Sequence, residues 1–384
     1  MSQRKKLFRY SDIYDLPGSD ALFCSAMQEM VAWHTQRNAD YAAILQQQGF
    51  APNQLQTIQD IAHLPPIPTL FFKKHSLFSV PAKKCIVKAT TSGTGGKKGM
   101  VGIDVSTGLD ALWAVLKTFK KHKLFSPIPT NYIILAYQPS KHNQMGITRT
   151  ATGFSLITPT LHREYALKNT GTSYETNFEG IERALYKYQK QGLPVRFMGL
   201  PAFLHYLLQQ MKEQNIRLKL HPKSLVCTGG GWKQFYFQKA DRRELYQLAQ
   251  EYLGVPEQNC RDFYGTVEHP VLYCDCKNHH FHVPVYSRIL VRDPATLQPL
   301  PYGQPGIINL ISPLMKSMPL ISLLPDDFAI LHEGKECGCG NPAPYFEILG
   351  RAGLEDIKTC AAGAGEMLEE QQPLAQNSRK ENLR

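Results

Sequence analysis

The residues from Thr90 to Gly99, TTSGTGGKKG, combine hydroxyl groups, glycines and two lysines. Backbone N–H groups of a glycine-rich loop, together with serine and threonine hydroxyls, can surround a phosphate, and Lys97 or Lys98 would add positive charge. The stretch is not a P-loop kinase signature, because no register places a hydroxyl residue directly after a Gly-Lys pair. A surface turn is the alternative interpretation. We expect a loop that binds the phosphates of a nucleotide, with ATP as the expected ligand.

The segments around this loop predict elements that could position it. Residues 85–90 have the pattern of a short strand, and residues 107–123 that of an amphipathic helix. Residues 20–48 show helical periodicity, and the proline-rich segment 64–74 is expected to lie on the main sheet. Further strand-like runs at 132–137, 196–199, 224–227 and 288–291 alternate with helical patterns at 175–190, 201–214 and 239–253. Such alternation favours an α/β fold with a largely parallel sheet.

The composition indicates a globular protein that can bury a large core. The chain has 384 residues, of which 43% are hydrophobic, and a formal net charge of +11, which is compatible with anionic ligands. It contains no apolar run of about 18 residues, and its start lacks the apolar core of a signal peptide. We therefore expect no membrane span and a cytoplasmic location. In that reducing setting the nine cysteines suit ligands, nucleophiles or buried positions better than disulfides.

Three further segments carry groups that suit a nucleotide. The glycines of Leu225–Lys233, LVCTGGGWK, would let the backbone approach a flat group closely. A tight strand-to-helix turn is the alternative interpretation. In Arg261–Glu268, RDFYGTVE, Tyr264 could cover an adenine ring and Glu268 could hold Mg²⁺. Leu324–Phe328, LPDDF, offers two carboxylates that could accept hydrogen bonds from ribose hydroxyls.

Taken in order, these segments resemble the adenylate-forming superfamily, whose members use ATP to convert a carboxylic acid to an acyl-adenylate and pyrophosphate. Within it the chain is most similar to the LuxE-type acyl-protein synthetases, the synthetase component of a bacterial fatty-acid reductase. The resemblance extends from about residue 65 to residue 360. It rests on the strings LPPIPTLFFKK, TTSGTGGKKG, TGGGWK, DFYGTVE, HFHVP, CGCG and LGRAG followed by DIKTC.

The resemblance implies a role for each matching residue. It assigns the phosphates to Thr91, Ser92, Gly93, Thr94 and Gly95, the adenine side to Gly229, Gly230 and Gly231, the base and the metal to Tyr264 and Glu268, the ribose to Asp327, and a further nucleotide contact to Arg351. Asp327 is preferred to Asp326 because the apolar pair Phe328-Ala329 follows it. We predict that Lys97 and Glu268 are catalytic. The superfamily motif reads Tyr-Gly-x-Thr-Glu, whereas here Val267 occupies the threonine position and Thr266 is the neighbouring hydroxyl.

Cys360 is the predicted acyl acceptor. In LuxE-type proteins a cysteine shortly after the Gly-Arg motif takes the acyl group as a thioester, and Cys360 lies nine residues after Arg351. Lys358 would favour the thiolate, which is the attacking form, if the two side chains lie close together. We expect no second folded domain of ordinary size after residue 352, and so no domain of the kind that admits coenzyme A. An unreactive thiol is the alternative interpretation.

A separate set of cysteines and histidines has metal-binding spacing. Cys274 and Cys276 form one Cys-x-Cys pair, and Cys337 and Cys339 form another, in a glycine-containing turn. Thiolates and a neutral imidazole are typical zinc ligands, so His280 or His282 could replace one cysteine in a four-ligand structural Zn²⁺ site. Two cysteine pairs without metal are the alternative interpretation. We name Cys274, Cys276, His280, Cys337 and Cys339 as the candidate ligands.

The sequence therefore predicts an α/β enzyme with an adenylate-forming domain of largely parallel sheets and a short C-terminal segment in place of a full C-terminal domain. The expected divisions are a helical N-terminal segment at 1–80, the adenylate-forming domain at 81–351, and a segment at 352–384 carrying the acceptor cysteine and a polar tail. The resemblance implies a fatty-acid substrate, an acyl-protein reductase partner of the LuxC type and the cofactors ATP and Mg²⁺, with self-association left open. An acyl-coenzyme A ligase like phenylacetate–CoA ligase is the second hypothesis. A zinc-stapled nucleic-acid-binding module is the third, but no nucleic-acid partner is expected because Arg-rich and aromatic strings are missing.

Overall fold

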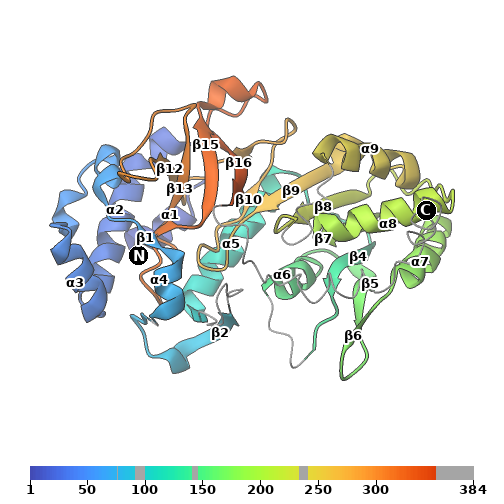
Figure 1. The fold of residues 1–384 in the computed structure, drawn as a ribbon, viewed down its shortest axis with the longest axis horizontal. Coiled ribbons are helices and arrows are strands. Elements are labelled where there is room, and N and C mark those ends of the chain that lie inside the picture. Colours follow the sequence, from blue (N-terminus) through green and yellow to red (C-terminus); the bar gives the residue numbers. More distant parts are fainter. Residues whose placement is uncertain (76, 91–99, 141–145, 233–240, 352–384) are drawn as a thin grey trace, which may run out of the picture. The chain divides into compact units, whose positions relative to one another are not determined.

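The chain forms two compact units, and each is described by itself. The structure is a computed structural model that describes residues 1–75, 77–90, 100–140, 146–232 and 241–351 (Figure 1). Unit 1 contains Met1–Phe125 and the described residues from Arg261 onward, and unit 2 contains Ser126–Cys260. Residues 1–80 therefore share a unit with later segments. The predicted divisions at residues 80 and 351 remain predictions.

Unit 1 begins with helices that pack on a sheet. Its α-helices are α1 (Gln3–Phe8), α2 (Leu16–Thr35), α3 (Ala39–Gln47), α4 (Thr69–Lys74) and α5 (Val105–Lys121), and its short 3₁₀ helices are η1 (Pro52–Gln54), η2 (Ile58–His63), η3 (Ala82–Lys84) and η6 (Gly334–Cys337). The helix expected over 20–48 is two helices, because the side chain of Asn38 accepts a hydrogen bond from the Tyr41 N–H and so starts α3 after a turn. Apolar side chains of α2 and α3 share a core with residues 311–323, and α2 and α3 lie on one side of this unit (Figure 1).

The main sheet of unit 1 is mostly antiparallel. Its strands run in the order β1-β14-β13-β15-β16-β11, with β12 also paired to β13. Their bounds are β1 (Ile67–Pro68), β11 (Phe281–His282), β12 (Arg288–Arg292), β13 (Pro305–Ile311), β14 (Ser322–Leu324), β15 (Asp327–His332) and β16 (Tyr345–Arg351). Only the pairing of β1 with β14 is parallel among these pairs. The segment expected to lie on the sheet thus supplies one of its strands, β1.

Two further strand pairs complete unit 1. Strands β2 (Cys85–Thr90) and β3 (Met100–Asp104) form their own antiparallel sheet, and β9 (Cys260–Tyr264) pairs with β10 (Tyr273–Cys274). The strand predicted over 85–90 is therefore correct. Strand β3, which was not predicted from the sequence, directly precedes helix α5.

Unit 2 has the parallel arrangement that the sequence indicated. Strands β8 (Leu225–Gly229), β7 (Val195–Gly199), β4 (Thr130–Tyr137) and β5 (Thr160–Asn169) are parallel neighbours, and β6 (Tyr174–Thr176) is antiparallel to β5. Every residue of β4 is buried, as expected for a parallel strand covered on both faces. The helical elements are α6 (Gly146–Phe154), α7 (Phe178–Gln191), α8 (Pro201–Glu213), α9 (Arg242–Leu253) and η5 (Glu257–Asn259).

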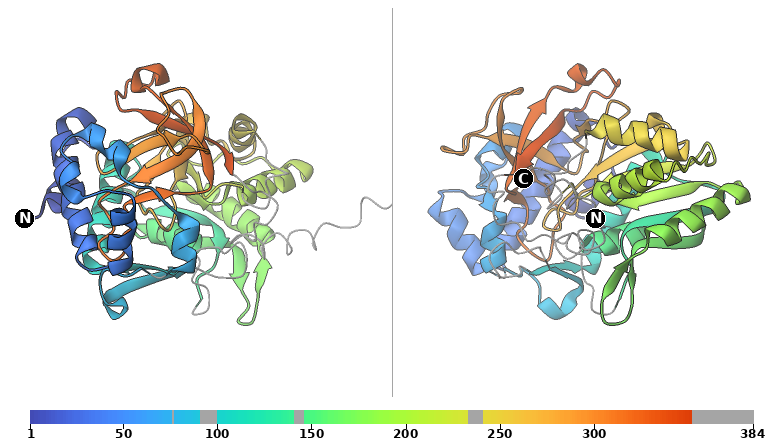
Figure 2. Two further views of the ribbon diagram at one scale, coloured as in Figure 1. Left: turned by 60° about the vertical axis from the view of Figure 1, so that its left-hand side comes forward. Right: turned by 45° about the vertical axis from the view of Figure 1, so that its right-hand side comes forward.

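One apolar core joins the sheet of unit 2 to three of its helices. It contains side chains of β4 and β7 together with α7, α8 and α9, and α8 and α9 lie side by side in both views of Figure 2. The α/β prediction is confirmed, but the largely parallel sheet holds for unit 2 only. Within residues 288–351 of unit 1, no α-helix separates successive strands, so this stretch lacks the helical crossovers that usually join parallel neighbours. Among the described helices, none combines the length and apolar character needed to cross a membrane.

The close contact between β4 and β7 predicts a strong effect of one substitution. Gly199 has φ +141°, and a Cβ atom there would lie 2.4 Å from the carbonyl oxygen of Leu135. Gly171 also has a positive φ, but a Cβ there would meet nothing within 4 Å. We expect Gly199→Ala to lower the free energy of unfolding by about 3 kcal/mol or more, and Gly171→Ala by about 1 kcal/mol, in urea denaturation. Equal losses would contradict this packing.

Candidate active site

Asp327 and Tyr264 meet at the beginning of β15. Asp327 is the first residue of that strand and is 5% exposed, whereas Asp326 is exposed to solvent. The Tyr264 hydroxyl, at the end of β9, donates a hydrogen bond to Oδ2 of Asp327 over 2.9 Å. An ionised carboxylate is an acceptor only, which is the property needed to bind ribose hydroxyls. The structure therefore brings together two residues predicted for the nucleotide.

Aromatic neighbours and strand pairing fix the position of these groups. The Tyr264 ring is half-buried and packs edge to face against Phe346, with ring centroids 5.4 Å apart. Asp327 on β15 is the register partner of Arg351 on β16, so the backbone of Arg351 lies opposite it. A β-bulge interrupts this pairing between Phe328 and Ala329, a feature that often redirects strands beside functional sites.

Glu268 lies in the bend that follows β9. It is 8% exposed, and the N–H of His269 donates to the Thr266 hydroxyl over 3.0 Å within the same bend. Val267, at the position where the superfamily has threonine, packs against the apolar core of unit 1. The hydroxyl of Thr266 thus stabilises the bend that carries the carboxylate. A buried carboxylate oxygen is a ligand type that Mg²⁺ accepts.

The three glycines predicted for the adenine side follow one another in unit 2. Gly229 ends β8, while Gly230 and Gly231 have φ values of 82° and 69°. Residues with side chains rarely adopt such values, so the strand ends in a turn that favours glycine. The turn lies at the carboxyl end of a parallel strand, which is where α/β folds commonly bind ligands.

Several predicted site residues lie outside the described residues. They are the phosphate-loop residues Thr91, Ser92, Gly93, Thr94 and Gly95, the lysine Lys97 and the acceptor Cys360. The side chain of Arg351 also lies outside the part of the chain that is described. Their roles remain predictions.

Four metal-ligating side chains of unit 1 gather into one group. The ligand atoms of Cys276, His282, Cys337 and Cys339 all lie within 4.8 Å of one another. The Cys337 sulfur is 3.5 Å from the Cys276 sulfur and 3.3 Å from Nε2 of His282, and the Cys339 sulfur is 3.2 Å from the same Nε2. Burial, followed by the neighbouring thiols of Cys339 and Cys276, raises the pKa of Cys337 to about 12.

This group differs from the predicted ligand set at two residues. Cys274 lies on β10, where it is paired with Phe263, and it is not one of the four residues. His280 is replaced in the group by His282, although Nδ1 of His280 is also 3.2 Å from the Cys337 sulfur. The sequence offered both histidines. The choice depends on β11, which pairs His282 with Tyr345 of β16 and thereby directs it to the turn that carries Cys337 and Cys339.

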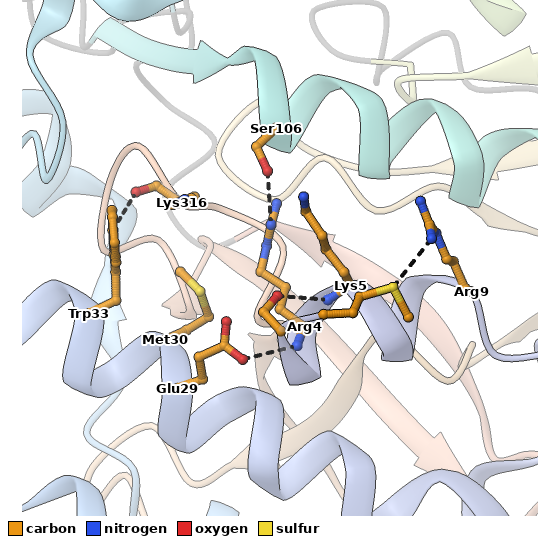
Figure 3. A pocket seen from close by; sticks show the side chains of 10 residues that line it. Arg4, Lys5, Arg9, Glu29, Met30, Trp33, Ser106 and Lys316 are labelled. Carbon is orange, nitrogen blue, oxygen red and sulfur yellow. Dashed lines mark hydrogen bonds between the residues drawn. The ribbon is translucent and has the colours of Figure 1, made fainter.

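A pocket of about 350 Å³ near the N-terminus contains none of the predicted site residues. Figure 3 shows its lining, with the guanidinium group of Arg4 near Ser106 and the carboxylate of Glu29 near the start of α1. Arg4 forms an ion pair with Asp110 at 2.9 Å, and the Lys316 amine lies 4.3 Å from the centroid of the Trp33 ring. These polar groups are already paired within the protein, so the pocket is not the candidate active site.

Solved structures support the class of the fold. A 2-hydroxyisobutyryl-CoA ligase in complex with 2-HIB-AMP and CoA, in the thioesterification state, matches with a TM-score of 0.65 and 18% identity over 88% of this chain and 69% of that chain. An open conformation of that ligase, in complex with 2-HIB-AMP and CoA, matches with a TM-score of 0.62 and 18% identity over 90% and 80% of the two chains. The protein therefore has the fold of the adenylate-forming ligases, as predicted.

Comparisons of the sequence identify the family to which the chain belongs. The model of the family described as "Acyl-protein synthetase, LuxE" matches residues 17–369, and the chain belongs to this family. Two similar proteins are named long-chain-fatty-acid–luciferin-component ligases. The Vibrio harveyi protein is 27% identical over 333 residues, 86% of this chain and 83% of its own, and the Aliivibrio fischeri protein is 27% identical over 350 residues, 89% and 88%. The protein is thus an enzyme of the acyl-protein synthetase type, and the predicted resemblance is confirmed.

The bend that carries Glu268 predicts a pH dependence of stability. Burial lowers the pKa of His269 to about 3, whereas an unfolded histidine titrates near pH 6.5. As the pH falls below about 6.5 the unfolded state binds the proton first, so at about pH 5 this residue lowers the free energy of unfolding by about 2 kcal/mol. We expect the free energy of unfolding, measured by urea denaturation, to fall between pH 7 and pH 5 by about 2 kcal/mol less in His269→Gln than in the wild type. The same loss in both proteins would contradict the role assigned to His269.

Proposed function

We propose that this protein uses ATP and Mg²⁺ to activate a fatty acid as an acyl-adenylate and then transfers the acyl group to its own Cys360. Membership of the acyl-protein synthetase family supports the acyl-protein product. The names of the two similar ligases support a long-chain fatty acid as the substrate. The observation on which the nucleotide site rests is the buried carboxylate of Asp327, held by the Tyr264 hydroxyl beside β16.

Each residue has a defined part in the proposed first step. Asp327 accepts hydrogen bonds from the ribose hydroxyls, and Tyr264 borders the adenine ring. Glu268 would hold Mg²⁺ together with the phosphates, which the loop Thr91–Gly95 and Lys97 would surround. A carboxylate oxygen of the fatty acid attacks the α-phosphorus, the bond to the β-phosphate oxygen breaks, and pyrophosphate leaves with that electron pair.

The second step moves the acyl group to the protein. The Cys360 thiolate attacks the acyl carbon, a carbon–sulfur bond forms, and AMP leaves with the electrons of the broken carbon–oxygen bond. The thioester keeps the acyl carbon electrophilic, which suits delivery to an acyl-protein reductase that forms an aldehyde. A ligase that transfers the acyl group to coenzyme A is the alternative outcome, and the two differ in where the acyl group is found.

A labelling experiment tests the acceptor. Protein is incubated with ATP, Mg²⁺ and a panel of radiolabelled fatty acids, and the denatured protein is treated with neutral hydroxylamine, which cleaves thioesters. We expect hydroxylamine-sensitive label on the wild type and on the control Cys24→Ser, and loss of this label in Cys360→Ser. Fatty-acid-dependent pyrophosphate exchange without labelled protein, together with an acyl-coenzyme A product, would instead identify a coenzyme A ligase.

Exchange of pyrophosphate into ATP tests the nucleotide site separately. Asp327→Asn replaces a charged acceptor with a neutral amide at the buried position, and Asp326→Asn makes the same change at the exposed neighbour. Because a hydrogen bond to a charged group contributes about 1.5–3 kcal/mol, Asp327→Asn should lower exchange at low ATP concentration about 10- to 100-fold. Asp326→Asn should exchange at nearly the wild-type rate. An unchanged rate in Asp327→Asn would contradict the ribose assignment.

A further inference from the structure

The four gathered cysteine and histidine side chains come from three separate segments of unit 1. Cys276 follows β10, His282 ends β11, and Cys337 and Cys339 lie in the connection between β15 and β16. The side chains of Cys276, His282 and Cys337 are buried, with exposed fractions of 8%, 1% and 5%, and Cys339 is partly buried. A ligand bound by all four residues would therefore link the connection between β15 and β16 to β11 and the segment before it.

The spacing of the ligand atoms fits a small tetrahedral ion. Zinc–sulfur bonds of about 2.3 Å place two sulfurs about 3.8 Å apart in a tetrahedral site. The group satisfies this requirement, since all four ligand atoms lie within 4.8 Å of one another. The sulfurs of Cys276 and Cys337, 3.5 Å apart, are not bonded to each other. Three thiols and an imidazole are a ligand set suited to Zn²⁺.

The orientation of His282 prepares one of its nitrogens for a metal. Its Nδ1 lies 2.7 Å from the carbonyl oxygen of Ala343, and because a carbonyl can only accept, Nδ1 carries the proton. The neutral ring then has its lone pair on Nε2, which is the atom that faces Cys337 and Cys339. A ring nitrogen held by a backbone carbonyl is the usual arrangement behind a metal-bound histidine.

Backbone and side-chain donors are also aimed at the sulfurs. The N–H of Asn278 donates to the Cys276 sulfur, and the N–H of Asn341 donates to the Cys339 sulfur, each over 3.3 Å. Both contacts join a cysteine to the residue two positions later, so the two turns repeat one geometry. Nδ1 of His280, whose ring stacks on Tyr345, lies 3.2 Å from the Cys337 sulfur. Hydrogen bonds of this kind favour the thiolate, which is the form that binds a metal.

From this geometry we propose that Cys276, His282, Cys337 and Cys339 bind one structural Zn²⁺ ion. Four protein ligands complete the coordination and leave no position for a substrate, so the ion has no part in the acyl transfer. Zn²⁺ binding would displace the thiol proton of Cys337, and His280 behind the ligands would donate its Nδ1 proton to the resulting thiolate. The site goes beyond the proposed function and does not depend on it.

Metal analysis of the intact protein tests the site directly. The protein is purified without a histidine tag, and its zinc is measured by inductively coupled plasma mass spectrometry. We expect about one zinc per chain, with X-ray absorption showing three sulfur ligands and one nitrogen ligand at about 2.3 and 2.0 Å. Wild-type protein free of zinc after purification and after incubation with Zn²⁺, or protein that holds iron instead, would overturn the proposal.

Matched variants test the ligand set. Cys339→Ser and His282→Gln should lose most of the zinc, whereas Cys274→Ser and His280→Gln, which change the same residue types nearby, should keep it. Loss of zinc from Cys274→Ser with retention in Cys339→Ser would reject this ligand set. If a ligand variant does not fold, the metal content and the absorption spectrum of the wild type still decide the question. Neither readout depends on acyl transfer.

Discussion

The antiparallel pairing of β15 with β16 is the constraint on which the candidate site depends. One end of the pair places Asp327 opposite the backbone of Arg351, and the connection at the other end carries Cys337 and Cys339. The β-bulge near Phe328 changes the register between these ends. The same hairpin therefore presents the carboxylate proposed for the ribose and anchors the group proposed for zinc. A zinc ion at the connection would limit the freedom of the hairpin far from the nucleotide.

The two units use different sheets because their connections differ. In unit 2, helices α7 and α8 separate successive strands, and such crossovers produce a parallel sheet with both faces covered. In unit 1, no α-helix lies within residues 288–351, and consecutive strands pair antiparallel: β12 with β13, β13 with β14, and β15 with β16. The fold also brings together residues from distant sequence positions: Tyr264 of β9 and Asp327 of β15 are 63 positions apart and share a hydrogen bond.

Local sequence patterns predicted the helices and strands more accurately than the pairing of the strands. The strand at 85–90 and the buried strand β4 were evident from apolar runs, and the adenylate-forming class followed from the motifs. The turn before Asn38 was missed because apolar periodicity continues across it from α2 to α3. The hydrogen bond of Tyr264 to Asp327 and the replacement of His280 by His282 depend on sheet register, which local patterns do not contain. Lys97, Cys360 and the phosphate loop remain predictions from sequence.

A crystal structure with an acyl-sulfamoyl adenosine, a stable analogue of an acyl-adenylate, tests the central claim most directly. We expect ribose hydroxyls within hydrogen-bond distance of the Asp327 carboxylate and the adenine ring beside Tyr264. We also expect the pairing of Asp327 with Arg351 to be kept. An analogue bound elsewhere, with Asp327 contacting only protein groups, would contradict the claim that this end of β15 and β16 forms the nucleotide site.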